Sequence, residues 1–580
     1  MAADPKTEIR EALRRALAAQ EPSLADFPIV FERPRNAEHG DFSCNVALLA
    51  GKKLDRNPRD LATSLMASDS FLLIRKNYLQ SDEIAGPGFI NFRLKPDVKQ
   101  AAVARVLAEG PDYGRGRPAK RDKVQVEFVS ANPTGPLHVG HGRGAAYGAS
   151  LAALLEFAGH EVTREYYVND AGRQVEILAL SVWLRYLQAR GQVVPFPEGG
   201  YRGEYVREIA ARLAAAHPTR FERQGIDALP VTGAGEDAEK ELDGLVAAAK
   251  SLLDTDWPLL QEFSLEEMLA EQRADLERFR VTFDRWFSER SLHDSGAVER
   301  TAAQLGKRGH TYEKDGALWF RSSAFGDEKD RVLRRENGQF TYFASDIAYH
   351  ADKLERGFER LIDVWGADHH GYVARVRGAI EALGHDPERL TVALVQFAVL
   401  LRGGAKLAMG KRSGEFVALR ELCEEVGDDA ARFFYVLRKS DQHLDFDLDL
   451  AKSESNENPV YYVQYAHARV CSVFAQWGGD PARLAAADLV PLRNPRELAL
   501  AQRLGEFPEL VQEAALELAP HSVAFYLRQL AAEFHSYYNA ERILVDDEEL
   551  RAARLALCAA VRQTLANGLA LLGVAAPEKM

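Results

Sequence analysis

The spacing of apolar and polar residues predicts a small α/β unit in residues 1–112. Ile9, Leu13 and Leu17 fall on one face of an N-terminal helix, and residues 86–92 form a glycine-led apolar run that is typical of a strand. The stretch that follows is rich in Gly, Pro and Arg, as linkers are. We therefore expect the first domain to end near residue 112.

A second domain, residues 113–451, is predicted to contain a parallel sheet. Apolar and β-branched residues indicate strands at 124–129 and 162–168, and residues 145–158 between them have the pattern of a helix that Gly159 ends. Strand, helix and strand in so short a stretch form a βαβ unit. We therefore expect a Rossmann-like parallel sheet with a ligand site at its carboxyl edge.

Two later apolar runs, 361–365 and 392–401, are predicted to complete this sheet, and residues 316–320 also have strand character. Residues from about 185 to 300 are charged and mostly helical. We interpret them as a helical insertion within the sheet domain.

Strand patterns end near residue 452. A helical period then continues through Val523, Leu527, Leu530 and Phe534. The expected fold class is therefore α/β, with a Rossmann-like catalytic domain and its helical insertion, a small α/β N-terminal domain, and an all-helical C-terminal domain over residues 452–580.

Composition adds few constraints to this picture. The 580 residues carry a formal net charge of -13, which is not the basic balance typical of nucleic-acid binders, although a local basic patch can serve instead. The four cysteines are scattered without a Cys-x-x-Cys pair, so we expect reduced thiols and no resident metal. Residues 1–20 lack the apolar core of a signal peptide, and no run is long enough to cross a bilayer. We expect a cytoplasmic protein without a membrane partner.

The first chemistry-bearing motif is the glycine-rich stretch 135–144, at a predicted strand-to-helix turn. A helix N-terminus offers unpaired N–H groups and partial positive charge, so it suits phosphate. His138 and His141 lie three residues apart in the first helical turn and can donate hydrogen bonds to phosphoryl oxygens as charge develops.

This turn has two other interpretations, a dinucleotide site and a purely structural helix start, and a P-loop at Gly410-Lys411 is a separate alternative for phosphate binding. Gly140, Gly142 and Ala145 fit the looser dinucleotide pattern, but the distance from Val129 argues against the tight turn that this pattern requires. A P-loop is rejected, because Gly410-Lys411 lacks the pattern's other fixed residues. A glycine-rich helix start with two satisfied histidines remains open on the motif alone.

The second motif is the basic, glycine-flanked stretch 407–414. Lys411 within it can follow phosphates as a point charge. By itself this stretch is weak evidence, since a solvated basic loop is the default interpretation.

Together the two motifs resemble those of class I aminoacyl-tRNA synthetases. Residues 138–141 (His-Val-Gly-His) are similar to the His-Ile-Gly-His signature, and residues 408–412 are similar to the Lys-Met-Ser-Lys-Ser loop, with Ala408 at the first lysine and Lys411 retained. The resemblance extends to bacterial-type arginyl-tRNA synthetases over nearly the whole chain, through residues 38–41, 86–89, 127–144, 166–174, 342–349, 365–372, 429–432 and 456–469.

This resemblance implies that arginine reacts with ATP to give arginyl-adenylate and pyrophosphate, and that the arginyl group then passes to the terminal ribose of tRNA-Arg with release of AMP. It implies L-arginine, ATP with Mg²⁺, and tRNA-Arg as partners, a monomer, and an N-terminal domain that binds the D-loop side of the tRNA. The implied catalytic residues are His138, His141 and Lys411. The implied ATP-binding residues are Pro136, Gly140, Gly142, Asp368, His369, His370, Met409 and Gly410.

A selective arginine pocket needs a carboxylate, because the guanidinium is planar, always charged and rich in donors. Asp346 is our candidate, with Tyr342 four residues earlier on the same helical or turn face. The alternatives are a surface ion pair for Asp346 and, for Glu127, a simple pair with Arg143. The resemblance implies further arginine-binding residues at Glu127, Ser130, Asn132 and His138.

Three further interpretations concern single segments. Adjacent histidines at 369–370 on an extended strand would point to opposite faces, which disfavours a metal site. Lys406, or the run from Lys120 to Lys123, is a candidate to supply the charge that Ala408 lacks. Aromatic residues suit unpaired RNA bases, although helical-core packing is their commoner fate. The candidate tRNA-binding residues are Tyr461, Tyr465 and Arg469, with Tyr462 and His467 as further aromatic candidates.

The rival functions are a small-molecule nucleotidylyltransferase, a non-catalytic RNA-binding paralogue and a synthetase for another amino acid. The large helical C-terminal domain argues against the first. The retained His138, His141 and Lys411 argue against the second, and Asp346 with Tyr342 argues against an apolar amino acid.

Overall fold

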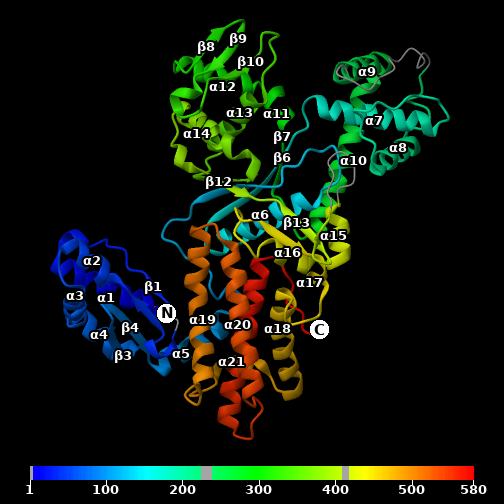
Figure 1. Cartoon of the computed structure of the whole chain (residues 1–580). Helices are drawn as coiled ribbons and strands as arrows, with labels where there is room; N and C mark the ends of the chain where they lie inside the picture. The colour runs from blue at the N-terminus through cyan, green and yellow to red at the C-terminus, as the bar shows by residue number, and fades with distance from the viewer. Residues whose placement is uncertain (1–3, 35, 224–237, 408–416) are drawn as a thin grey trace.

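A computed structural model describes residues 4–34, 36–223, 238–407 and 417–580 (Figure 1). The N-terminal domain has a four-stranded antiparallel sheet in the order β1-β2-β4-β3. Ile9, Leu13 and Leu17 are buried in its own core, as predicted. Its elements are α1 (Pro5–Gln20), β1 (Phe31–Glu32), β2 (Phe42–Cys44), α2 (Val46–Leu54), α3 (Pro58–Met66), α4 (Asp69–Tyr78), β3 (Leu79–Ala85) and β4 (Phe89–Leu94).

The central domain contains the predicted parallel sheet. Its strand order is β12-β11-β5-β6-β7, and every neighbouring pair is parallel. The chain order reverses at β5, and such switch points hold ligands at the carboxyl ends of the strands. The five strands are β5 (Lys123–Glu127), β6 (Glu161–Val168), β7 (Arg285–Ser288), β11 (Arg360–Gly366) and β12 (Leu390–Val395).

The helix between β5 and β6 is longer than predicted. It is α6 (Val139–Phe157), so it begins well before residue 145. His138 caps it, because its Nδ1 accepts a hydrogen bond from the N–H of Gly140. Residues 139–144, the second part of the glycine-rich stretch, therefore belong to the helix itself, and residues 135–138 lead into it.

The predicted strand 392–401 is wrong as a single element. The run divides into β12 and β13 (Ala398–Arg402), and β13 joins β14 (Ala405–Lys406) and β15 (Leu444–Asp447) in a separate sheet. The chain leaves the parallel sheet at Gln396, whose N–H donates to the carbonyl of Ser440 and whose carbonyl accepts from Arg143. A continuous apolar run gave no sign of this break.

The helical insertion has its own hydrophobic core, formed by α7 (Arg173–Ala189), α8 (Glu204–Ala216), α9 (Ala238–Leu253) and α10 (Trp257–Arg278). The predicted extent of about 185–300 is too long at its end, because residues 285–288 form β7, which pairs with β6 in the parallel sheet. This short strand lies in a charged region that looks helical overall.

A small antiparallel sheet, β10-β9-β8, follows β7 and includes the predicted strand at 316–320. In the chain, helix α13 connects this sheet to β11 of the parallel sheet, and helix α14 connects β11 to β12. The elements are α11 (Glu289–Asp294), α12 (Ala297–Lys307), β8 (Thr311–Lys314), β9 (Ala317–Phe320), β10 (Arg331–Arg334), α13 (Tyr342–Glu355), α14 (Val373–Ala382), α15 (Leu419–Val426), α16 (Asp428–Tyr435) and α17 (Leu448–Lys452).

The C-terminal domain is helical, as predicted. One continuous hydrophobic core joins it to β5 and α6 of the central domain. Buried Arg432 helps to link them, because its guanidinium donates to the carbonyls of Leu572 (2.9 Å) and Phe279 (2.7 Å). The helices are α18 (Pro459–Trp477), α19 (Pro495–Leu516), α20 (Pro520–Ala540) and α21 (Glu548–Leu571), and α5 (Pro96–Glu109) packs on α19 and α21.

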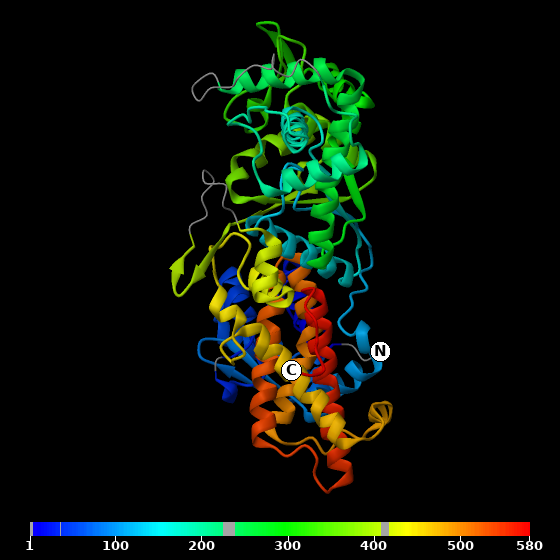
Figure 2. The same ribbon diagram turned by 90° about the vertical axis from the view of Figure 1, so that its right-hand side faces the viewer.

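Figure 2 shows the C-terminal helices and the helical insertion at opposite ends of the molecule, with the parallel sheet between them. The C-terminus lies where the helical domain meets the central domain in both views. Among the residues that the structure describes, no helix is both long and apolar enough to cross a membrane.

Candidate active site

A cavity of about 330 Å³ lies at the carboxyl edge of the parallel sheet, in the size range of small-molecule sites. Glu127, the last residue of β5, and Gly366, the last residue of β11, both line it. Asp346 and Tyr349 reach it from α13, and Tyr372 from the short helix that follows β11. The cavity therefore lies at the switch point of the strand order, as expected for a ligand site.

Asp346 is half-buried in this cavity, and its Oδ2 accepts a hydrogen bond from the Tyr372 hydroxyl. Burial raises the pKa of Asp346, although the Tyr372 hydrogen bond opposes this shift. Tyr372 is itself held, because the Arg375 guanidinium lies 4.8 Å from its ring centroid and Arg375 Nε donates to Asp327 (3.1 Å). No lysine or arginine of the described chain forms a salt bridge with Asp346.

Glu127 does not pair with Arg143, which overturns that alternative. Glu127 Oε2 accepts from the Lys353 ammonium at 2.7 Å, and its Oε1 accepts from the Ser130 hydroxyl at 3.0 Å. Arg143 is buried elsewhere and donates to backbone carbonyls, including that of Gln442 (2.8 Å). Glu127 thus stays at the cavity with both oxygens held.

The loop after β5 has an unusual backbone. Val129 and Ser130 adopt φ values of 69° and 42°, which are uncommon for residues with a side chain. This turn brings the Ser130 hydroxyl to Glu127, and the same hydroxyl oxygen accepts from the N–H of Tyr167 at 3.1 Å. Asn132 is exposed further along the loop, with its Oδ1 3.2 Å from the Asn169 side chain.

His138 and His141 face each other at the start of α6. Their ring centroids are 3.7 Å apart, and His141 Nδ1 accepts from the His138 N–H at 3.2 Å. Burial, helped by the neighbouring His138, lowers the pKa of His141 to about 3, so this ring is neutral at pH 7. Because Nδ1 of each ring accepts a backbone N–H, the neutral rings carry their proton on Nε2. Both side chains are therefore hydrogen-bond donors at Nε2.

The other predicted residues of this turn have different surroundings. Pro136 is half-buried and precedes the helix. Gly140 has no room for a side chain, because a Cβ would lie 2.8 Å from the His138 ring. Gly142 is buried, and a Cβ there would lie 2.9 Å from Tyr435, so its lack of a side chain serves close packing.

Asp368, His369 and His370 lie just beyond the carboxyl end of β11. They are all exposed and belong to a 3-10 helix, Ala367–Tyr372, so the premise of an extended strand is wrong. Of the three, only His369 lines the cavity. Among the described residues, no group of three or more His, Cys, Asp and Glu side chains could hold a metal ion.

Tyr342 is the first residue of α13 and is 60% exposed. The hydroxyl that bonds to Asp346 belongs to Tyr372 instead. The candidates Lys411, Met409 and Gly410 lie outside the described residues.

The proposed charge donors near the start of β5 lie at the wrong edge of the sheet. Lys120 and Lys123 are at the amino end of this strand, whereas Glu127 ends it at the cavity, about 13 Å further along. Lys120 pairs with Glu359 at 2.5 Å. Lys406 is exposed on β14 and remains a candidate.

The sequence analysis gave no role to several polar residues at or behind the cavity, among them Lys353, Tyr372, Asp363 and Glu289. Lys353 lies seven residues after Asp346 in α13, so helical spacing puts both on one face, a signal that was available. Tyr372 lies in the stretch 365–372, one of the segments that carry the family resemblance, but it was given no role there. Asp363 and Glu289 gave no signal. Burial, followed by the Asp346 charge, raises the pKa of Glu289 to about 7.

A second group of predicted residues lies on α18, far along the chain from the cavity. Tyr461 and Tyr465 stack with ring centroids 5.9 Å apart, and the Arg469 guanidinium lies 4.6 Å from the Tyr465 ring centroid. All three are partly exposed and line a hollow together with His535. His467, by contrast, is buried with its Nδ1 2.8 Å from the carbonyl of Pro577, so it packs in the helical core.

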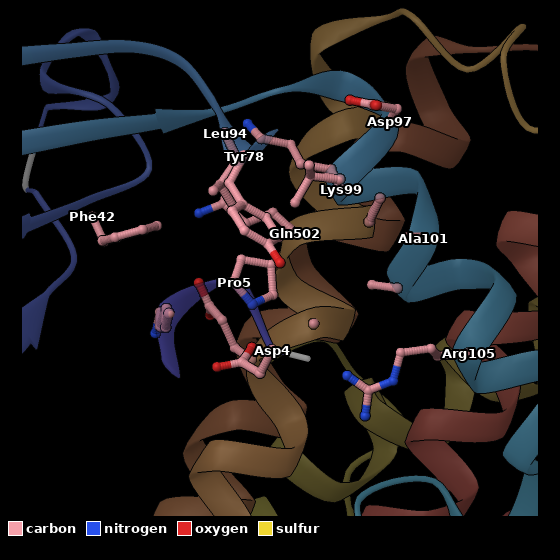
Figure 3. A pocket seen from close by; sticks show the side chains of 16 residues that line it. Asp4, Pro5, Phe42, Tyr78, Leu94, Asp97, Lys99, Ala101, Arg105 and Gln502 are labelled. Atoms are coloured by element: carbon pink, nitrogen blue, oxygen red, sulfur yellow. The ribbon is translucent and has the colours of Figure 1, made fainter. Parts of the chain in front are cut away.

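Another cavity, of about 260 Å³, lies between the N-terminal domain and the C-terminal helices (Figure 3). Phe42 and Leu94 reach it from the N-terminal sheet, Pro5 from α1, and Arg105 and Gln502 from α5 and α19. None of the described residues predicted to bind arginine, ATP or tRNA lines this second cavity. This cavity is a feature of the domain contact, separate from the candidate active site.

Comparisons with known proteins give one consistent result. Three family models match: the arginyl tRNA synthetase N terminal domain over residues 6–94, the catalytic domain of class I (R) tRNA synthetases over 102–198 and 253–445, and the DALR anticodon binding domain over 463–580. The arginine–tRNA ligases of Azoarcus sp. (strain BH72) and Aromatoleum aromaticum are 62% and 61% identical to this chain, over 100% of both chains in each case. The solved Thermus thermophilus arginyl-tRNA synthetase is 26% identical over 98% of this chain and 99% of its own, with a TM-score of 0.76.

Proposed function

Because this chain belongs to the arginyl-tRNA synthetase family, we propose that the cavity at the ends of β5 and β11 holds the arginine that the enzyme activates. The reaction is arginine–tRNA ligation: arginine is activated with ATP and then transferred to tRNA.

Asp346 is the proposed guanidinium acceptor, and the observation that carries this assignment is its position in the cavity, where no lysine or arginine of the described residues forms a salt bridge with it. Tyr372 occupies one of its oxygens, which leaves the other for the substrate. A charge-assisted bond from a planar guanidinium suits this oxygen, whereas a lysine ammonium presents a different geometry. Glu127, Ser130 and Asn132 are the proposed partners for the remainder of the arginine, with His138 and Tyr342 near it.

The proposed phosphate site is the start of α6. Arginine's carboxylate oxygen attacks the α-phosphorus of ATP, and the bond to the leaving pyrophosphate breaks. The Nε2–H groups of His138 and His141 would stabilise the negative charge that develops on the phosphoryl oxygens. Pro136, Gly140 and Gly142 shape this turn, and the proposed adenosine side is the 3-10 helix with Asp368, His369 and His370.

Lys411, with Met409 and Gly410, is proposed to act on the same phosphates. The described chain that follows this stretch returns to the start of α6: the N–H of Val139 donates to the carbonyl of Val417 (3.1 Å), and the N–H of Leu419 donates to the carbonyl of Leu137 (2.8 Å). This connection supports a role beside His138. Mg²⁺ is proposed to arrive with ATP, since Mg²⁺ is usually bound through substrate phosphates.

The three domains are proposed to extend over residues 1–112, 113–451 and 452–580, with tRNA bound by the first on its D-loop side and by the last at its anticodon. Tyr461, Tyr465 and Arg469 form the proposed anticodon contact, because stacked aromatics and a guanidinium suit unpaired bases. A cytoplasmic monomer is also proposed. All four cysteines are free, which fits a reducing compartment.

The test of the arginine site is Asp346→Asn, assayed by pyrophosphate exchange in the presence of tRNA with each amino acid. The KM for arginine should rise at least about 100-fold, as expected when a charged hydrogen-bond partner is lost, while the KM for ATP changes less than about twofold. The matched control is Asp352→Asn on the same helix, since Asp352 pairs with Arg356 (2.7 Å) and should leave both KM values as in the wild type. Equal changes in both KM values for Asp346→Asn would refute the role.

A further inference from the structure

Lys353 is a lysine with no exposed surface. Its ammonium lies 2.7 Å from Glu127 Oε2, 2.8 Å from Asp363 Oδ1, and 4.3 Å from the ring centroid of Tyr349. A buried ammonium is costly unless it is paired and hydrogen-bonded, and here two carboxylates and an aromatic face supply that pairing. This lysine therefore ties together β5, β11 and α13, the three elements that line most of the cavity.

Asp346 belongs to the same arrangement. His350, one turn after it, has Nδ1 2.8 Å from the Asp346 carbonyl and Nε2 2.9 Å from Asp363 Oδ2. Lys353 follows one turn later on the same helical face. Lys353 does not line the cavity, so its ammonium lies behind Asp346, the carboxylate proposed to bind the substrate's guanidinium.

Glu127 is fixed at both oxygens. Lys353 binds Oε2, and the Ser130 hydroxyl donates to Oε1 at 3.0 Å. The left-handed backbone at Val129 and Ser130 is what brings this hydroxyl to Glu127. Strained backbone of this kind persists where the surroundings enforce it, commonly at functional sites.

The charges around the ammonium do not balance without it. Glu127, Asp363 and Asp346 are three carboxylates in one low-dielectric region, and among the described lysines only Lys353 pairs with any of them, binding Glu127 and Asp363. If the ammonium were removed, mutual repulsion would favour protonation of at least one carboxylate. Glu165 on β6 is a further carboxylate nearby, but it has its own partners, since Arg356 pairs with it (2.6 Å) and the Tyr349 hydroxyl donates to it (2.7 Å).

We propose that Lys353 is a positioning residue for arginine, which holds Glu127 ionised and oriented so that a cationic substrate meets a carboxylate. The inference rests on the proposed arginine-binding role of Glu127. Removing this positive charge should therefore weaken the binding of a positively charged substrate. Simple attraction between charges would predict the opposite.

The experiment is Lys353→Met in the full-length enzyme, assayed by pyrophosphate exchange with tRNA between pH 6.5 and pH 9. We expect the KM for arginine at pH 7 to rise at least tenfold and then to fall as the pH increases and Glu127 ionises. The KM for ATP should change less than twofold. A lower or unchanged arginine KM, or a pH profile parallel to that of the wild type, would overturn the proposal.

The matched control is Lys99→Met. Lys99 is also buried and pairs with a carboxylate, Asp41, at 2.6 Å, but it lines the cavity between the N-terminal domain and the C-terminal helices and not the candidate active site. This variant should lose thermal stability while its arginine KM and pH profile stay as in the wild type. A similar arginine effect in both variants would show that the loss of any buried lysine suffices, and would overturn the proposal.

Should Lys353→Met fail to fold, three further variants keep the proposal testable. They are Lys353→Arg, Glu127→Gln, and the double variant Glu127→Gln/Lys353→Met. The charge-retaining variant should have an arginine KM within about threefold of the wild type. The double variant should match Glu127→Gln, without the added pH dependence, because residue 127 then has no carboxylate whose ionisation needs the ammonium, while Asp363 keeps its contact with His350. If the double variant shows the combined arginine KM increases of the two single variants, the proposal is overturned. If Glu127→Gln alone leaves the arginine KM unchanged, the proposed role of Glu127 fails instead.

Discussion

The hydroxyl of Tyr372 donates a hydrogen bond to Oδ2 of Asp346, between residues that lie 26 positions apart in the chain. The Arg375 guanidinium packs against the Tyr372 ring and donates a hydrogen bond to Asp327. Asp327 also binds Arg331 of β10 at 2.8 Å. The carboxylate proposed to bind arginine is therefore oriented by the small antiparallel sheet as well as by its own helix.

This relationship leads to a prediction for Tyr372→Phe. Loss of the hydroxyl removes the largest of the effects that oppose the burial-raised pKa of Asp346, ahead of the His350 and Lys353 charges, so the carboxylate should be less ionised and less well oriented. A hydrogen bond to a charged group contributes about 1.5–3 kcal/mol, so the arginine KM should rise about 10- to 100-fold. Steady-state pyrophosphate exchange measures this value.

Two observations would check the cause. The defect should shrink as the pH rises, because a higher pH restores the Asp346 carboxylate whose pKa has been raised. Tyr526→Phe removes another buried hydroxyl, bound to the Arg503 carbonyl at 2.8 Å, and should leave the arginine KM unchanged. A Tyr372→Phe enzyme with wild-type arginine KM would show that this hydrogen bond does not orient the substrate's partner.

A second prediction separates the two roles of His141. Its Nδ1 caps the start of α6, and its Nε2 is the proposed phosphate donor. Asparagine places an acceptor near the Nδ1 position but has nothing at Nε2, whereas glutamine extends an N–H group toward the Nε2 position. His141→Asn should therefore keep its melting temperature while kcat falls about 100-fold or more.

His141→Gln should recover part of that kcat and lose some stability, because the cap is weakened by about 1 kcal/mol. Thermal unfolding and single-turnover adenylate formation measure the two effects. If the Asn and Gln variants lose kcat equally, Nε2 is not the functional donor.

The sequence revealed the His138–His141 turn because its chemistry is local. The N-cap and its partner lie three residues apart, and one helical turn determines their geometry. The parallel sheet and the helical C-terminal domain were predicted for a similar reason, since hydrophobic periodicity is a property of each element.

Contacts between distant segments were not predictable in this way. Helical spacing suggested Tyr342 as the companion of Asp346, whereas the hydroxyl that binds Asp346 comes from Tyr372 through tertiary packing. Lys353 and Glu127 are 226 positions apart, and nothing in either local sequence indicates their pairing. The four-residue strand β7 was hidden for the same reason, because its pairing with β6 bridges the whole helical insertion.

A third prediction concerns the charge that Ala408 does not supply. Lys406 is exposed on the hairpin that follows Phe397, and Phe397 lies near the start of α6: a Cβ on Gly140 would be 3.6 Å from its ring. Lys120 lies at the opposite edge of the sheet. Lys406→Ala should lower kcat about 10-fold, less than the loss of a buried donor, and Lys120→Ala should have no effect. A wild-type rate for Lys406→Ala would discard Lys406 as the substitute.

The last prediction concerns the aromatic surface of α18 and α20. Arg469 lies over Tyr465 and over Tyr538 (4.8 Å), and its guanidinium reaches the Asn539 side chain at 3.3 Å. It therefore both orders the stacked tyrosines and presents positive charge beside them. Base stacking on such residues contributes about 1–3 kcal/mol, so Arg469→Ala should raise the KM for tRNA about 10-fold or more.

The same variant should leave the KM values for arginine and ATP unchanged, because the surface is remote from the cavity. Its tRNA affinity should also depend less steeply on salt, since one phosphate-neutralising charge is lost. Arg562 lies 5.0 Å from the Phe474 ring centroid on another face of this helical domain, so Arg562→Ala is the matched control and should bind tRNA as the wild type does. If both variants weaken tRNA binding equally, general charge in the helical domain attracts tRNA, and the Tyr465–Arg469 stack has no specific part in recognition.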